Sequence, residues 1–166
     1  GIKVFNTNDE SIRDFKTFFK SKENYFESLY IYSFYLDTDS CLWVGTRDSG
    51  LYIYDIKSDK VIDVSEELDI KKLNHAVVRE MVCDEFGNFW VATNVGLCCI
   101  NLKDNSYVFY NHDKKDKKSI PHDDIFDLML SDDLLYVTTG DGLAVYDYNR
   151  EDFTTYLLPD TLTKQD

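Results

Sequence analysis

The hydrophobic and polar positions of this chain repeat with a period of 46 residues. Three segments, 42–55, 89–101 and 135–147, each open on a strand-like run: Leu-Trp-Val-Gly-Thr, Phe-Trp-Val-Ala-Thr and Leu-Tyr-Val-Thr-Thr. A turn of two or three residues follows each run, and then Gly-Leu and further apolar residues. The glycines stand at positions 50, 96 and 142, so the three copies share one register. A fixed period of this length indicates a repeat architecture.

Each repeat contains four stretches of strand character. In the second copy these are 77–83, 89–93, 96–102 and 106–111, rich in β-branched and aromatic residues. The links between them are short, and short links join antiparallel neighbours because a parallel pair needs a crossover of about a dozen residues. No helical segment is expected between the strands. The pattern predicts an all-β fold, a β-propeller segment of four-stranded antiparallel blades.

The copies divide the chain into three complete blades plus half of a fourth. The run Gly-Ile-Lys-Val-Phe-Asn at 1–6 aligns with residues 50–55, so 1–30 are predicted to hold the outer strands of a partial blade and a link. The blades are expected at 31–76, 77–123 and 124–166, the last with a C-terminal tail. For residues 14–29, an outer strand and a loop are favoured over one or two amphipathic helical turns.

The residues shared by the copies have structural explanations. The large rings at Trp43, Trp90 and Tyr136 are expected to fill the wedge between neighbouring blades. The glycines at 50, 96 and 142 are expected to have a positive φ or to approach another backbone closely. The threonines at 46, 93 and 139 are expected to form local hydrogen bonds at the end of the second strand.

The repeats resemble the two-component regulator propeller repeat. Residues 84–97 read Asp-Glu-Phe-Gly-Asn-Phe-Trp-Val-Ala-Thr-Asn-Val-Gly-Leu. The family signature is similar: Asp, two residues, Gly, one residue, Leu-Trp-Ile-Gly-Thr, a short turn and Gly-Leu. Ser-Ile-Pro at 119–121, ahead of Asp-Asp-Ile at 123–125, also matches the family's lead-in. The third copy departs from the signature at Tyr136 and in a shortened turn at 131–133. The resemblance covers nearly the whole chain.

The resemblance implies the periplasmic sensor region of a Bacteroides-type hybrid two-component system. In that family, propellers joined to a small β-sandwich pass a signal across the membrane to a histidine kinase, and many members respond to oligosaccharides. The implied function is recognition of an oligosaccharide in the periplasm, with the remainder of the sensor propeller and the kinase as partners. The alternative is a protein–protein interaction propeller with no small-molecule ligand, and a propeller lyase or hydrolase is a more distant one.

The charge balance argues against two classes of partner. The chain has 18 Lys and Arg residues against 31 Asp and Glu, a formal net charge of −13. Binding to nucleic acid needs a basic stripe that neutralises phosphates, so no nucleic acid is expected as a partner. No direct membrane contact is expected either, because anionic lipids attract basic segments. No run reaches the roughly 18 apolar residues of a membrane span, and no secretory leader opens the chain.

No catalytic or metal-binding pattern stands out, so the chain is expected to be no enzyme and to hold no cofactor or metal ion. It contains no nucleophile elbow, P-loop or HExxH motif. Residues 37–40, Asp-Thr-Asp-Ser, begin like a calcium loop but lack its glycine and terminal glutamate, so a hairpin turn is favoured. The acidic pairs at 123–124 and 132–133 and the histidines at 75, 112 and 122 are interpreted as solvated. The four cysteines form no CxxC pair and are interpreted as core or surface residues.

If a ligand binds, the candidate residues lie in the links at one face of the propeller. The links between second and third strands gather there, as do those between blades. Polar hydrogen-bonding groups beside aromatic rings suit a sugar. The candidates are Arg47, Asp48, Asn94, Asp141, His75 and His122.

The half blade raises a question of assembly. An open propeller leaves unpaired edge strands at both ends. Three and a half blades are half of seven, so a homodimer could close one propeller. The other interpretation is a truncated segment whose edges associate non-specifically.

Overall fold

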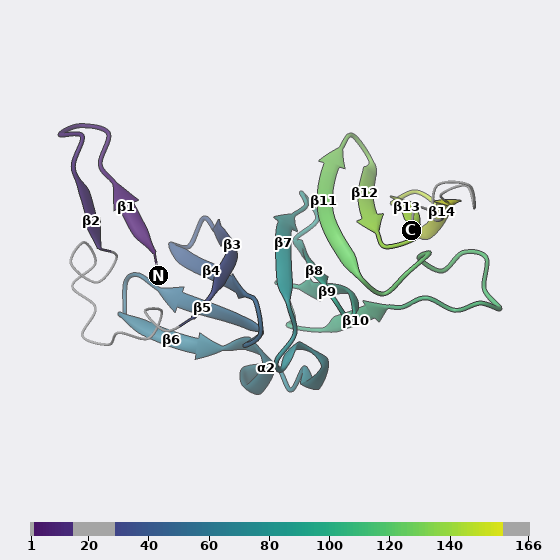
Figure 1. Ribbon diagram of the computed structural model, residues 1–166, viewed down its shortest axis with the longest axis horizontal. Helices are drawn as coiled ribbons and strands as arrows, with labels where there is room; N and C mark the ends of the chain where they lie inside the picture. Colours follow the sequence, from purple (N-terminus) through teal and green to yellow (C-terminus); the bar gives the residue numbers. More distant parts are fainter. Residues whose placement is uncertain (1, 15–28, 158–166) are drawn as a thin grey trace, which may run out of the picture. The chain divides into compact units, whose positions relative to one another are not determined.

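The computed structural model describes residues 2–14 and 29–157. In these ranges the strands form three four-stranded antiparallel sheets and one two-stranded sheet (Figure 1). Each four-stranded sheet is a simple meander in which neighbours in sequence are neighbours in space. The predicted all-β propeller segment, with its four-stranded blades, is therefore confirmed. The chain divides into two compact units, Gly1–Val77 and Val78–Asp166, and each is described by itself.

The first unit holds a two-stranded hairpin and one blade. The hairpin consists of β1 (Lys3–Phe5) and β2 (Ile12–Asp14). The strands of the blade are β3 (Ile31–Leu36), β4 (Cys41–Thr46), β5 (Leu51–Asp55) and β6 (Lys60–Asp63). Ile2 and Val4 of the hairpin pack against a buried cluster on the blade that includes Val44 and Tyr54. Of the expected outer strand and loop at 14–29, only the first and last residues are described, and 15–28 lie outside the described residues.

A short helix follows this blade, so the expectation of no helical segment was wrong at this point. The elements are α2 (Val64–Glu67) and the 3-10 helix η1 (Lys71–Leu73). The Asp63 carboxylate caps α2, accepting hydrogen bonds from the backbone N–H of Ser65 at 2.9 Å and of Glu66 at 3.4 Å. An Asp cap with Glu in the first turn is a helix-start signal that was visible in the sequence at 63–66.

The second unit holds two blades that share one hydrophobic core. The first comprises β7 (Val78–Cys83), β8 (Asn88–Thr93), β9 (Gly96–Asn101) and β10 (Tyr107–Tyr110). The second comprises β11 (Ile125–Ser131), β12 (Leu134–Thr139), β13 (Gly142–Asp147) and β14 (Asp152–Leu157). The strands of the first agree with the predicted ranges to within one residue at each end. Trp90, Ala92 and Leu97 of the first blade pack against Leu135, Ala144 and other residues of the second.

The first strand of each four-stranded blade begins with a β-bulge, which the sequence reasoning missed. The pairing register shifts at Tyr32 in β3, at Arg79 in β7 and at Phe126 in β11. The signal was the spacing of apolar residues, as in Ile125, Leu128 and Leu130. These apolar residues are spaced by three and then by two, whereas strict strand alternation spaces them by two throughout. One extra residue in a strand produces the spacing of three.

Candidate functional site

The links between second and third strands are built alike in the three blades. Each strand-end threonine hydroxyl donates to the carbonyl of the glycine that opens the third strand, over 2.8 Å at Thr46, 2.6 Å at Thr93 and 2.9 Å at Thr139. The expected local hydrogen bonds are thus confirmed. Gly96 has φ +123°, and a Cβ atom on it would lie 2.8 Å from the Tyr110 carbonyl oxygen. Both a positive φ and a close approach therefore require glycine there, as predicted.

At the opposite ends of two blades, an aspartate receives the indole N–H of the blade's tryptophan. Trp43 Nε1 donates to Asp37 Oδ2, and Trp90 Nε1 donates to Asp84 Oδ2, each over 3.0 Å. Asp37 also accepts from two backbone N–H groups of its own turn, which confirms the hairpin-turn interpretation of 37–40. The six-residue spacing of each pair was visible in the sequence, but the bond it encodes was not inferred.

Asp84 is held in its ionised form by these donors. Burial alone would raise the pKa of this carboxyl group, but hydrogen bonds from Trp90 and Asn88 outweigh that effect and hold the pKa below its ordinary value. Trp90 itself is 1% exposed. Its ring lies 5.3 Å from that of Tyr146 and 6.3 Å from that of Tyr148, centroid to centroid, both in the neighbouring blade. The predicted role of this tryptophan between blades is confirmed.

Three of the six predicted ligand-binding residues, Arg47, Asp48 and His75, belong to the first unit, and all three are exposed. The turn that carries Arg47 and Asp48 is tied to the link that carries His75, because the N–H of Gly50 donates to the Ala76 carbonyl over 3.1 Å. The Arg47 guanidinium carbon lies 5.6 Å from the centroid of the Tyr30 ring. The fold thus brings these three residues to one end of the blade.

The other three, Asn94, His122 and Asp141, belong to the second unit and are also exposed. The amide of Asn111 joins the turn after Asn94 to the link that carries His122, donating to the Val95 carbonyl over 2.9 Å and to Asp123 over 3.1 Å. The His122 ring lies against Gly140, next to Asp141. Binding of a ligand by any of the six stays a prediction.

The acidic pair at 123–124 differs from its expected solvated state. Asp123 accepts from Asn111, and Asp124 forms an ion pair with Arg79 over 2.6 Å. Arg79 also lies over the Phe126 ring, 4.8 Å from its centroid. The pair therefore fastens one blade to the next. The exposed state expected for Asp132, Asp133 and the three histidines is confirmed.

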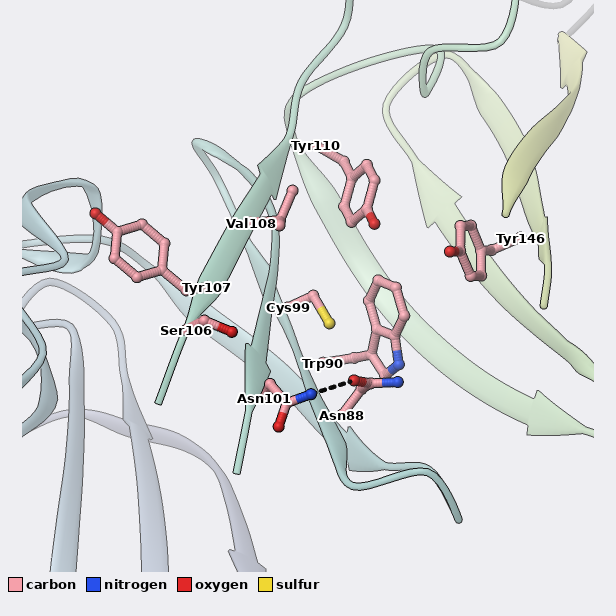
Figure 2. A pocket seen from close by; sticks show the side chains of 9 residues that line it. All are labelled: Asn88, Trp90, Cys99, Asn101, Ser106, Tyr107, Val108, Tyr110 and Tyr146. Carbon is pink, nitrogen blue, oxygen red and sulfur yellow. Dashed lines mark hydrogen bonds between the residues drawn. The ribbon is translucent and has the colours of Figure 1, made fainter. Parts of the chain in front are cut away.

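A cleft of about 190 Å³ opens on the side of the blade β7–β10 and is also lined by Tyr146 of the neighbouring blade (Figure 2). None of its lining residues is an Asp, Glu, Lys or Arg; they are Asn88, Trp90, Cys99, Asn101, Ser106, Tyr107, Val108, Tyr110 and Tyr146. In Figure 2 the two amide side chains lie together beside Trp90 and Cys99, joined by a hydrogen bond from Asn101 Nδ2 to Asn88 Oδ1 at 3.5 Å.

A second and larger cleft, of about 510 Å³, opens between the two blades of this unit. It is acidic: the carboxylates of Asp84, Glu85, Asp132 and Asp133 line it together with Phe86 and Tyr148. Neither cleft is lined by any of the six predicted residues.

Within 2–14 and 29–157, no group of three or more His, Cys, Asp or Glu side chains is placed to hold a metal ion. The four cysteines are free thiols.

The sequence model described as two component regulator propeller matches residues 25–48. The chain carries a two-component regulator propeller repeat. This confirms the repeat family to which the sequence was compared above. No curated protein matches the chain.

Solved structures with the same fold include extracellular domains of bacterial regulatory systems. The domain of BT3049, described as a hybrid two component system of B. thetaiotaomicron, is 23% identical over 78% of this chain and 19% of its own, with a TM-score of 0.64. That of BT4673, described as a one component system of the same organism, is 21% identical over 76% and 16%, with a TM-score of 0.57.

A third similar structure is PorZ, a surface component of the type-IX secretion system of Porphyromonas gingivalis. It is 18% identical over 86% of this chain and 20% of its own, with a TM-score of 0.56. The chain therefore spans about a fifth of the length of these three structures. At these identities the likeness shows the propeller fold. In the part of the chain that the structure describes, no helix is long and apolar enough to cross a membrane.

Proposed function

We propose that this propeller segment belongs to the periplasmic sensor region of a hybrid two-component system, where it helps to recognise an oligosaccharide and signals to a histidine kinase outside this chain. The observation that carries the proposal is the match of residues 25–48 to the two-component regulator propeller repeat. The fold, shared with extracellular domains of two-component systems, supports the same assignment.

The chemistry of the surface supports a sugar as the ligand. A chain with a net charge of −13 repels anions, so polyanionic ligands are disfavoured. The exposed link residues Arg47, Asn94 and His122 offer hydrogen bonds without a concentrated charge of either sign. Exposed polar groups in loops on a rigid scaffold are typical of binding sites for polar ligands.

The test is a thermal-shift screen of the intact receptor that contains this segment. The probes are cello-, manno-, xylo- and galacto-oligosaccharides of two to six units, each at 1 mM. Stabilisation by one class is expected, because a ligand that binds only the native state raises the melting temperature. No shift with any class, together with a tightly bound protein recovered as a stoichiometric complex, would replace sensing with the interaction-propeller alternative.

A further inference from the structure

Two side chains that line the side cleft of blade β7–β10 are smaller than their counterparts in the first blade. Three residues stand side by side across β8, β9 and β10: Trp90, Cys99 and Val108. In the first blade the same row is Trp43, Ile53 and Ile62. Cys99 stands in place of Ile53, and Val108 stands in place of Ile62. Both replacements are smaller, so less side-chain volume lies beside the Trp90 indole. In the third blade the row is Tyr136, Val145 and Thr154, so among the three described blades only the second combines an indole with two small neighbours.

A pair of amides at the mouth of the cleft is also peculiar to this blade. Asn88 and Asn101 are cross-strand partners. The same positions hold Cys41 and Asp55 in the first blade and Leu134 and Asp147 in the third. The amides are thus a second feature that the common blade does not explain.

Asn101 has one role in common with its counterparts in the other blades, which is to accept a backbone N–H of the turn that follows. Its Oδ1 accepts the backbone N–H of Lys103 over 2.9 Å. Asp55 and Asp147 accept the corresponding turn N–H over 2.8 and 2.9 Å, so a carboxylate serves this turn equally well. What Asn101 adds is an uncharged NH₂ group. One of its hydrogens is directed to Asn88 over a long 3.5 Å contact, which leaves donor capacity at the mouth of the cleft.

The cleft is also neutral in a chain rich in acid. Burial, with a smaller contribution from Asp84, raises the pKa of the Cys99 thiol to about 12, so it stays protonated. Burial likewise raises the pKa of the Tyr110 hydroxyl. The rings of Trp90 and Tyr110 stack 5.8 Å apart at 26° and form an apolar wall. Uncharged donors and acceptors beside an aromatic wall select a neutral ligand with both hydroxyl and C–H surfaces.

We infer that this cleft binds a single uncharged sugar ring, either a monosaccharide or one unit of a longer glycan. The volume decides the size: about 190 Å³ is below the roughly 300 Å³ at which pockets for drug-sized ligands begin. One ring fits, and the rest of a glycan would extend into solvent past Ser106 and Val108. The inference rests on the proposed function for its ligand class, but it places the contact in a cleft that none of the six link residues lines.

The experiment measures binding of methyl glycosides of glucose, galactose, mannose and N-acetylglucosamine to the intact protein by saturation-transfer NMR, with glucuronic acid as the charged control. At least one neutral glycoside is expected to bind with a Kd in the millimolar range. Cys99→Ile, which restores the side chain of the first blade, and Asn101→Asp, which restores the turn acceptor of both other blades, should each weaken that binding at least tenfold. The matched control is Asp55→Asn, the reverse exchange at a residue that does not line this cleft, which should leave the Kd unchanged.

The outcomes separate this site from the general function. Failure of every neutral glycoside to bind overturns the inference. It is also overturned if the Asn101→Asp variant is folded, as judged by circular dichroism, and binds the glycoside as tightly as the wild type. If oligosaccharides nevertheless stabilise the receptor in the thermal-shift screen, sensing stands and its site lies elsewhere. If oligosaccharides do not stabilise the receptor, but a glycoside binds the wild type and binds both cleft variants more weakly, the cleft site is supported and oligosaccharide sensing is refuted.

Discussion

The hydrogen bond from Trp90 to Asp84 is expected to be a principal local contribution to the stability of the second unit. Replacing Asp84 with alanine removes the acceptor of four hydrogen bonds: those from the N–H groups of Phe86 and Asn88, the Asn88 amide and the indole. The turn N–H groups are only part-buried and can be rehydrated. The indole N–H is more deeply buried, because Trp90 is 1% exposed and packs against the next blade.

The magnitude follows from that difference in solvent access. A hydrogen bond to a charged acceptor contributes about 1.5–3 kcal/mol, and leaving a buried donor unsatisfied costs about 1–3 kcal/mol. We therefore expect Asp84→Ala to lower the free energy of unfolding by about 3 kcal/mol. Asp84→Asn should cost nearly as much, since donors approach both carboxylate oxygens and an amide offers only one acceptor.

The assay is urea unfolding followed by far-UV circular dichroism. The matched control is Ser131→Ala at the corresponding position of the third copy, where Tyr136 replaces the tryptophan; this surface change should stay within about 0.5 kcal/mol. A double-mutant cycle isolates the bond, because in a Trp90→Phe background no indole N–H remains to be orphaned. If Asp84→Ala costs the same in that background as in wild type, the indole bond is not the cause and the reasoning is refuted.

Three further outcomes follow from the same structure. Gly96→Ala should destabilise by about 2 kcal/mol in urea unfolding, because an alanine at that φ meets a carbonyl oxygen. Gly140→Ala lacks the positive φ and meets the His122 ring, whose Nδ1 accepts the N–H of Asp124, so it should cost less. Phe34→Ser should reduce self-association in sedimentation velocity without loss of stability, since this side chain is 67% exposed. Leu128→Ser, at the same register position but 6% exposed, should cost about 3 kcal/mol. Because the pKa of Asp84 is lowered in the fold, its stabilisation is present above about pH 4 and is lost as the pH falls through the folded pKa, so the Asp84→Asn variant should show a weaker acid dependence.

Most of the fold could be predicted because its determinants are local and repeated three times. Strand positions follow from alternation, and the 46-residue period fixes which strands form one blade. The threonine–glycine links could be predicted for the same reason: donor, acceptor and turn lie within four residues of one another, as at Thr46 and Gly50. Helix α2 was missed because the repeat pattern outweighed a cap signal present in only one copy. The bulges were missed because a single extra residue changes the alternation only slightly.

The side cleft could not be predicted from the sequence, because it depends on pairing between strands. Asn88 and Asn101 are 13 residues apart and become neighbours only when β8 and β9 adopt their observed register. Cys99 is one of two adjacent cysteines, and the sequence alone does not say which of them faces the indole. In the structure Cys98 is buried on the opposite face and Cys99 lines the cleft.

In a repeat protein, positions that agree between copies are largely used in building the blade, so recognition has to be sought where the copies differ. The shared tryptophan, threonine and glycine are engaged in hydrogen bonds or close backbone contacts within the blade. The cleft is such a place, because Cys99 and Asn101 differ from their counterparts in both other blades. The copies also differ at the predicted link residues, because the position after the strand-end threonine holds Arg47, Asn94 and Gly140 in turn. Variants that convert one copy into another, such as Asn101→Asp, are therefore the most informative for this chain: they keep the blade and remove only what is particular to it.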